Sequence, residues 1–108
     1  MRITFTARHF KTSERLKEFA EERVKKLAKY YDGILDIEIV LDYIKQEQVA
    51  ELVAKVYGTR LAVIEKSDDM YKSIDLAVDK LERQLKRYKG KMRGFEKERI
   101  AENITDNE

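Results

Sequence analysis

One apolar stripe at helical spacing, along residues 69–93, constrains the fold of this chain more than any other feature of its sequence. Its members recur every three or four residues: Met70, Ile74, Ala77, Val78, Leu81, Leu85 and Tyr88. Side chains at that spacing share one face of an α-helix, so the segment predicts a long amphipathic helix that must cover a core. Residues 67–69, Ser-Asp-Asp, supply its N-terminal cap.

Apolar and polar residues alternate in the segments that would form the sheet beneath this helix. Alternation is typical of strands with one buried face. It predicts strands over 2–8, 35–43, 49–57 and through Leu61 and Val63. In the second strand it directs five side chains to the core: Leu35, Ile37, Ile39, Leu41 and Tyr43. Gly58-Thr59 predicts a two-residue hairpin turn, because glycine can supply a positive φ.

A second amphipathic helix is predicted between the first two strands. Thr12 or Ser13 can cap it, and its apolar stripe continues to Tyr31, where Asp32-Gly33 ends it. The order is therefore β-α-β-β-β-α. The first connection is long enough for a right-handed crossover between parallel strands, and the other strands form antiparallel hairpins. Since each helix has one apolar stripe, we expect an α+β domain of two layers, a four-stranded sheet with both helices on one face.

The distribution of charge is more informative than the net charge of +2. Residues 30–79 hold five basic and eleven acidic side chains, a balance of −6, whereas residues 80–93 hold seven basic and one acidic, a balance of +6. The last fifteen residues have a balance of −3. A row of cations on a rigid helix suits a polyanion such as a nucleic-acid backbone.

Several classes of function are disfavoured by composition. The chain has no cysteine, which excludes disulfides, thiol nucleophiles and zinc–thiolate sites. Its four glycines are isolated, and its one histidine, His9, has no catalytic partner motif. Asp36, Glu38 and Asp42 alternate along one strand, which indicates a solvated sheet face more than a metal site. We therefore expect no enzyme, no cofactor, no metal and no small-molecule substrate.

No segment predicts export or a membrane span. The N-terminus alternates and reaches a charge at Arg8, unlike a signal peptide, and no apolar run approaches the roughly 20 residues that cross a bilayer. A cytoplasmic chain with no membrane partner, monomeric when free, is the expectation.

The charged and aromatic residues also have purely structural interpretations, as alternatives to contact with nucleic acid. On the long helix, Asp79 can pair with Arg83 and Glu82 with Lys86, and on the first helix Glu21 can pair with Lys25 and Glu22 with Lys26. Arg23 lies at the edge of the apolar arc, so its stem can pack on the core. The tyrosines could stack on bases, although packing is the favoured interpretation for Tyr31, Tyr57 and Tyr88.

Two stretches carry long motifs. The predicted long helix contains Asp69-Met70-Tyr71, Ile74-Asp75, Asp79-Lys80-Leu81, Arg83-Gln84-Leu85 and Lys89. The first predicted strand and helix contain Ile3-Thr4, Ala7-Arg8, Thr12, Leu16 and Phe19. Both motifs resemble the family of ribosome hibernation promoting factors and ribosome-associated inhibitors, and the resemblance covers residues 1–93.

The resemblance implies a domain similar in shape to double-stranded-RNA-binding domains. It implies binding to the small ribosomal subunit and its rRNA at the decoding region, where mRNA and tRNA are blocked and translation is inhibited in stationary phase or stress. The RNA-binding residues that it implies are Lys80, Arg83, Lys86, Arg87, Lys89 and Lys91 on the last helix, and Arg23, Lys25, Lys26 and Lys29 on the first.

The extent of the resemblance and the composition of the C-terminus together predict how the chain is divided. Residues 1–93 would be the ribosome-binding domain. Residues 94–108 have only Phe95, Ile100 and Ile104 as large apolar residues, which predicts a flexible acidic tail, mostly disordered or a fraying helix. A long form of the family has a second domain that brings ribosomes together as dimers. Fifteen residues are too few for that domain, so we expect a short form or the N-terminal piece of a long one. A generic double-stranded-RNA-binding module and a protein-interaction module remain the alternative functions.

Overall fold

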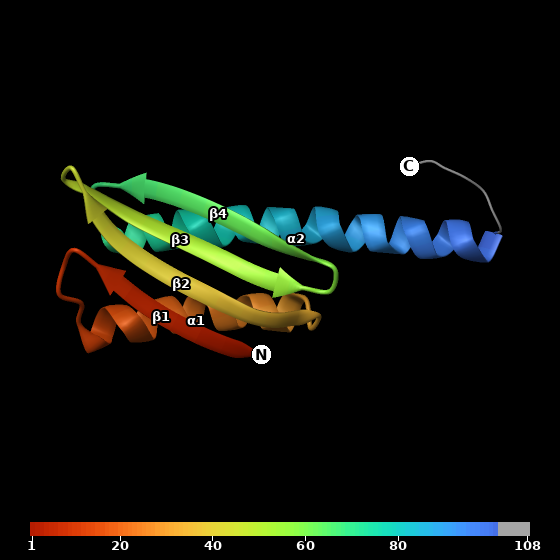
Figure 1. Ribbon diagram of the computed structural model, residues 1–108, viewed down its shortest axis with the longest axis horizontal. Helices are drawn as coiled ribbons and strands as arrows, with labels where there is room; N and C mark the ends of the chain where they lie inside the picture. The colour runs from red at the N-terminus through yellow and green to blue at the C-terminus, as the bar shows by residue number, and fades with distance from the viewer. Residues whose placement is uncertain (102–108) are drawn as a thin grey trace.

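The computed structural model describes the backbone of residues 1–101 and the side chains of residues 1–90. Its elements follow the predicted order, β-α-β-β-β-α (Figure 1). They are β1 (Arg2–Arg8), α1 (Glu14–Tyr30), β2 (Ile34–Ile44), β3 (Glu47–Val56), β4 (Thr59–Ser67) and α2 (Met70–Ala101).

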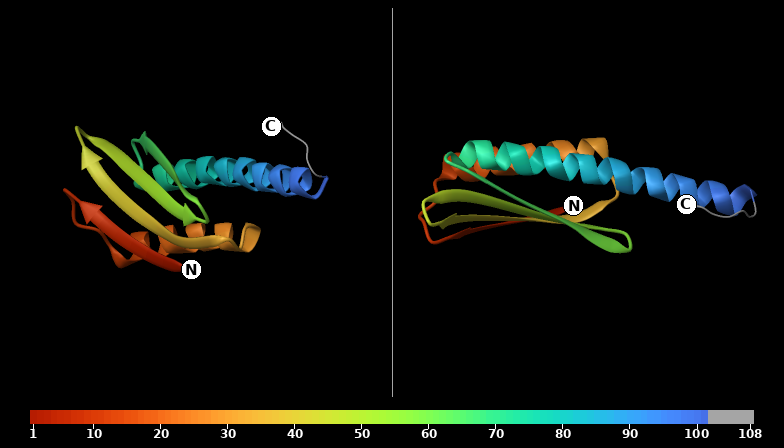
Figure 2. Two further views of the ribbon diagram at one scale, coloured as in Figure 1. Left: turned by 45° about the vertical axis from the view of Figure 1, so that its right-hand side comes forward. Right: turned by 90° about the horizontal axis from the view of Figure 1, so that it is seen from above.

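The strands form a four-stranded sheet in the order β1-β2-β3-β4. β1 is parallel to β2, whereas β2–β3 and β3–β4 are antiparallel hairpins. Both helices lie on one face of this sheet and run in the same direction, as the views in Figures 1 and 2 agree in showing. The two-layer α+β architecture expected from the sequence is therefore confirmed.

The core lies between the helices and the inner face of the sheet. Ile39 in β2 pairs with Phe5 on one side and with Leu52 on the other, and both Ile39 and Leu52 are completely buried. From α2, Leu81 and Leu85 are also completely buried. Burying one such side chain contributes about 1.5–3 kcal/mol. This row of contacts holds α2 against the sheet and fixes which of its faces meets solvent.

Side-chain caps set where the two helices begin. Ser13, rather than Thr12, caps α1: its hydroxyl accepts a hydrogen bond from the Leu16 N–H at 3.1 Å. At the start of α2, the Asp69 carboxylate accepts from the Tyr71 N–H at 2.9 Å. Each cap satisfies a backbone donor that the first turn would leave without a partner.

The start and end of β2 differ from the sequence-based expectation. The pairing with β3 shifts register between Ile34 and Asp36, which indicates a bulge. Ile34 is consequently buried, whereas Leu35 is 54% exposed. Tyr43, also predicted to face the core, is 40% exposed near the β2–β3 turn. Simple alternation could not predict the bulge, because the extra residue changes which side chains face inward.

The three acidic residues predicted to form a solvated face of β2, Asp36, Glu38 and Asp42, are not all exposed to solvent. Asp42 is buried, and its Oδ1 lies 2.8 Å from the Nδ1 of His9 and accepts the Tyr43 N–H at 2.8 Å. The hydrogen bond with His9 lowers the pKa of Asp42, with further help from the Tyr43 N–H and from Arg8. His9 therefore connects the loop after β1 to β2.

The β3–β4 turn lies one residue earlier than expected. Val56 pairs with Thr59, so the two turn residues are Tyr57 and Gly58, and Gly58 has a φ of 85°. The shift moves Tyr57 out of the core, and it is 77% exposed. The interpretation of Tyr57 as a packing residue is therefore wrong.

The β2–β3 turn has a conformation that its residues do not favour. Lys45 and Gln46 have φ values of 50° and 67°, the positive values typical of a type I′ hairpin, where asparagine and glycine are preferred. We expect Gln46→Gly to stabilise the protein by about 0.5–1 kcal/mol, because it relieves this strain. Urea denaturation would measure the gain. Gln46→Ala, which keeps the strain, should give none, and equal stability of the two variants would contradict the prediction.

α2 is longer than predicted, since its backbone is helical to Ala101 instead of ending near Arg93. The first eight residues of the predicted tail, 94–101, are therefore helical. Residues 102–108 lie outside the described part of the chain. The division at residue 93 stays a prediction.

Candidate nucleic-acid interface

α2 presents a basic surface that its own buried stripe holds in place. Arg83, Lys86 and Arg87 are exposed, and Lys89 is half-buried. They lie next to Leu81, Leu85 and Tyr88, which pack on the sheet, so the helix cannot rotate to hide them. None of these four cations has an ion-pair partner among the residues with described side chains.

The intrahelical pairs suggested by the sequence are not formed. In the region whose side chains are described, no carboxylate oxygen of Asp79 or Glu82 lies within 4.0 Å of a charged nitrogen of Arg83 or Lys86, and the same holds for Glu21 and Glu22 with Lys25 and Lys26. Exposed pairs of this kind contribute only about 0.3–0.5 kcal/mol, which does not hold two long side chains together. The charges of these cations remain available to a partner.

Lys80 is the exception on α2. Its Nζ lies 3.4 Å from Oε2 of Glu65 on β4, and the two side chains are 43% and 29% exposed. The sequence offered no acid within the helix for Lys80, and the sheet supplies one. Lys91, the last predicted cation, lies outside the residues whose side chains are described.

α1 adds three of the predicted cations to the same layer of the molecule. Lys25, Lys26 and Lys29 are exposed and have no ion-pair partner within residues 1–90. Lys29 also occupies the last turn of α1, where the negative end of the helix dipole favours a cation. Both helices lie on the same face of the sheet (Figure 2). The predicted cations that have no ion-pair partner in the described region therefore come from two elements of one layer, and we call them together the helix cation face: Lys25, Lys26, Lys29, Arg83, Lys86, Arg87 and Lys89.

Arg23 joins the two helices instead of standing free. Its Nε donates to Oδ1 of Asp75 at 2.8 Å, and its guanidinium carbon lies 4.3 Å from the ring centroid of Phe19. The Phe19 ring in turn meets that of Tyr71 on α2 edge-on at 4.8 Å. Arg23 therefore positions α1 against α2, and a role in RNA binding stays a prediction.

Aromatic rings connect the two helices at the end of α1. The Nζ of Lys89 lies 5.2 Å from the ring centroid of Tyr30 and 6.0 Å from that of Tyr31, and the Nζ of Lys86 lies 5.9 Å from that of Tyr30. Tyr31 also meets Tyr88 edge-on at 5.9 Å. Burial raises the pKa of Tyr31, with a smaller contribution from Tyr88. Cations and rings thus share this part of the surface.

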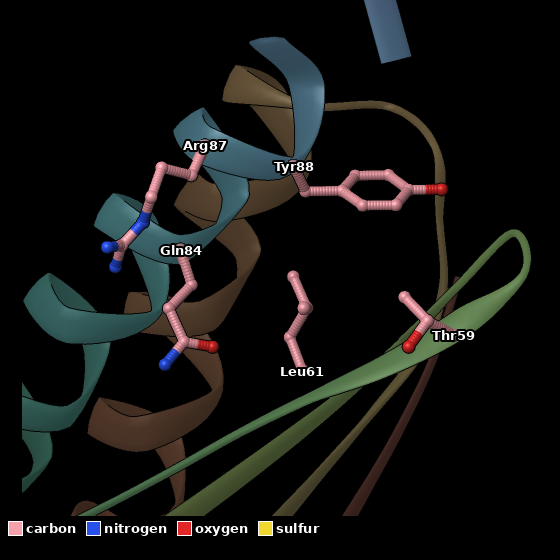
Figure 3. Close-up of a pocket in the computed structure, with 5 residues that line it drawn as sticks. All are labelled: Thr59, Leu61, Gln84, Arg87 and Tyr88. Carbon is pink, nitrogen blue, oxygen red and sulfur yellow. The ribbon is translucent and has the colours of Figure 1, made fainter. Parts of the chain in front are cut away.

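A pocket opens beside the helix cation face, between α2 and β4. Its volume is about 430 Å³, and Figure 3 shows the five side chains that line it: Thr59, Leu61, Gln84, Arg87 and Tyr88. Only Arg87 among them was predicted as a functional residue. Gln84 could have been found from its position, since it lies one turn from both Lys80 and Arg87 on the predicted helix. Thr59 could not, because it reaches the pocket only through the fold.

The described residues contain no group of three or more histidine, cysteine, aspartate or glutamate side chains that could hold a metal ion. Within the same part of the chain, no helix has the length and apolar character needed to cross a bilayer.

Comparison with solved structures reveals two close matches. A ribosomal subunit interface protein from Coxiella burnetii superposes with a TM-score of 0.79 at 32% identity, covering 83% of this chain and 99% of that one. The N-terminal domain of Protein Y from Thermus thermophilus gives a TM-score of 0.74 at 31% identity, covering 82% and 99%.

Sequence comparison agrees. A ribosome hibernation promoting factor from Salmonella typhimurium is 31% identical over 93 residues, which cover 86% of this chain and 98% of that protein. Its counterpart from Azotobacter vinelandii is 29% identical over 91 residues, covering 84% and 85%. The family model described as sigma 54 modulation protein / S30EA ribosomal protein matches residues 3–93. This chain therefore belongs to the sigma 54 modulation protein / S30EA ribosomal protein family, which includes the ribosome hibernation promoting factors.

Proposed function

We propose that this chain is a ribosome hibernation factor that binds the small ribosomal subunit at the decoding region. The helix cation face contacts rRNA phosphates, and the bound domain excludes mRNA and tRNA and so inhibits translation in stationary phase or stress. The chain acts in the cytoplasm and is a monomer when free.

The observation that carries this proposal is the helix cation face itself. Seven cations without ion-pair partners in the described region lie on two helices that a common core holds in fixed positions. Such an array repels itself in the free protein, and a polyanion relieves that repulsion. The relatives are ribosome hibernation factors, a class without enzymatic activity, and one solved neighbour is a ribosomal subunit interface protein.

Sedimentation through a sucrose gradient tests the proposal. The chain should sediment with isolated small subunits, and mRNA and initiator tRNA bound to the subunits beforehand should prevent it from doing so. Sedimentation with large subunits only, or indifference to mRNA and tRNA, would contradict binding at the decoding region. Equal affinity for a free RNA duplex and for small subunits would instead favour a generic double-stranded-RNA-binding module.

Affinity for small subunits should fall steeply with salt. If about five of the seven cations each neutralise one phosphate, the plot of log affinity against log salt concentration should have a slope of roughly −3.5 to −4.5. Binding measured between low and physiological ionic strength would give this slope. A slope near zero would mean that contacts other than phosphates dominate.

A further inference from the structure

The pocket between α2 and β4 has the parts of a site for a flat aromatic ligand. Figure 3 shows the Tyr88 ring extending from α2 toward the β3–β4 hairpin, with Leu61 drawn below the ring and Thr59 below its hydroxyl end, nearer the hairpin. Gln84 lies one turn earlier on the same side of α2. A volume of about 430 Å³ falls within the range of ordinary small-ligand pockets, about 300–1,000 Å³. One aromatic wall, an apolar floor and a polar rim therefore meet in one place.

The Tyr88 ring is held in position before any ligand arrives. Its hydroxyl donates a hydrogen bond to the backbone carbonyl of Tyr57, and Tyr31 packs against it edge-on at 5.9 Å. A ring fixed at both its edge and its hydroxyl loses little conformational entropy when a ligand stacks on it. Tyr88 is thus a preformed stacking surface.

Gln84 supplies the polar recognition group. Its amide makes no hydrogen bond to any residue whose side chain is described, and it is only partly exposed. A glutamine amide has one acceptor and two donors, the combination that pairs with the edge of a nucleobase. An amide of this kind beside a fixed ring suits a ligand with both a flat face and a hydrogen-bonding edge.

The charge around the pocket identifies the ligand class. Arg87 lines the pocket, is exposed and belongs to the helix cation face. An RNA phosphate bound to Arg87 would therefore bring the base of the same nucleotide to the entrance of the pocket. Proteins recognise unpaired RNA bases through this combination of stacking, edge hydrogen bonds and backbone cations. A base held in a duplex cannot enter, because both its faces and its pairing edge are occupied.

We propose that this pocket binds one unpaired nucleobase of RNA, stacked against Tyr88 and hydrogen-bonded to the Gln84 amide, with Arg87 on the adjoining phosphate. The inference rests on the proposed function and deepens it. The helix cation face supplies affinity without sequence preference, and the pocket requires an unstacked nucleotide in the RNA that is bound. A duplex alone would leave the pocket empty.

The test separates the base from the phosphates. Two single-stranded RNAs of about eight nucleotides would be compared, one with a central 2-aminopurine and one with an abasic site there, so that both carry the same charge. The full chain should bind the first about tenfold or more tightly, since stacking on one aromatic side chain is worth about 1–3 kcal/mol per base. The fluorescence of 2-aminopurine should fall on binding.

Gln84→Leu should reduce this preference at least severalfold while affinity for the abasic RNA stays unchanged. Gln46→Leu, the same change in the β2–β3 turn, should keep the full preference. Equal binding of the two RNAs by the unmodified chain would overturn the proposal, as would a full preference in Gln84→Leu. Neither result would contradict the proposed function, because that function is tested independently by whether the unmodified chain sediments with small subunits.

Discussion

Reversing four cations of the helix cation face should abolish binding to the small subunit. The variant changes Lys29, Arg83, Lys86 and Arg87 to glutamate; all four are exposed and free of ion pairs within residues 1–90. A hydrogen bond to a charged group contributes about 1.5–3 kcal/mol, and each reversal also adds repulsion from phosphate. We expect affinity to fall on the order of a thousandfold or more, as measured by co-sedimentation at fixed ionic strength.

A control variant with the same net charge makes this result interpretable. Arg2, Lys11, Lys45 and Arg60 are also exposed, and they lie on strands and connections outside the two helices. Changing these four to glutamate alters the net charge equally and should lower affinity far less. The free energy of unfolding of both variants should lie within about 1 kcal/mol of that of the unmodified chain, because substitutions at exposed positions rarely disturb packing. Equal loss of binding in both would show that net charge, not the helix cation face, attracts the ribosome.

Lys80 and Arg23 are left out of that variant for a structural reason. Glu65 pairs with Lys80, and Asp75 pairs with Arg23. Replacing either cation by glutamate would set two carboxylates against each other and disturb the contact between elements. A loss of binding could then reflect a displaced helix instead of a lost RNA contact.

Of the substitutions proposed here, Leu85→Ala should lower the free energy of unfolding the most. Leu85 is completely buried between α2 and the sheet, and the substitution removes apolar contacts and leaves a cavity. Such changes cost about 2–5 kcal/mol, a large share of the roughly 5–15 kcal/mol that stabilises a typical domain. Thermal unfolding should show a Tm lower by roughly 10 °C or more.

Leu76→Ala on the same helix is the matched control. Leu76 is 37% exposed, and its loss should change stability by no more than about 0.5 kcal/mol. Below its own Tm, the Leu85→Ala variant should still bind small subunits, since its cations are intact. A Tm close to that of Leu76→Ala would contradict the burial of Leu85.

Part of the candidate site was predictable because it depends on the helix alone. Arg83, Lys86 and Arg87 repeat beside an apolar stripe, so a helix that buries the stripe must expose them. The remaining side chains depended on their neighbours. Glu65 lies fifteen residues before Lys80, and Asp75 lies 52 residues after Arg23. Helical spacing predicts neighbours only three or four residues apart, so it could not predict these pairs. The outward position of Tyr57 followed from a turn that begins one residue earlier than expected.

The order of elements, the inner faces of both helices and the excess of cations on α2 could be predicted from the residues alone. Each follows from periodicity or local charge, which act over a few residues. Three features needed the folded chain: which cations lack an ion-pair partner in the described region, the β2 bulge that exposes Leu35, and the pocket that Gln84 and Tyr88 share with Thr59. These depend on contacts between segments far apart in the chain, and the packing of the helices on the sheet sets such contacts.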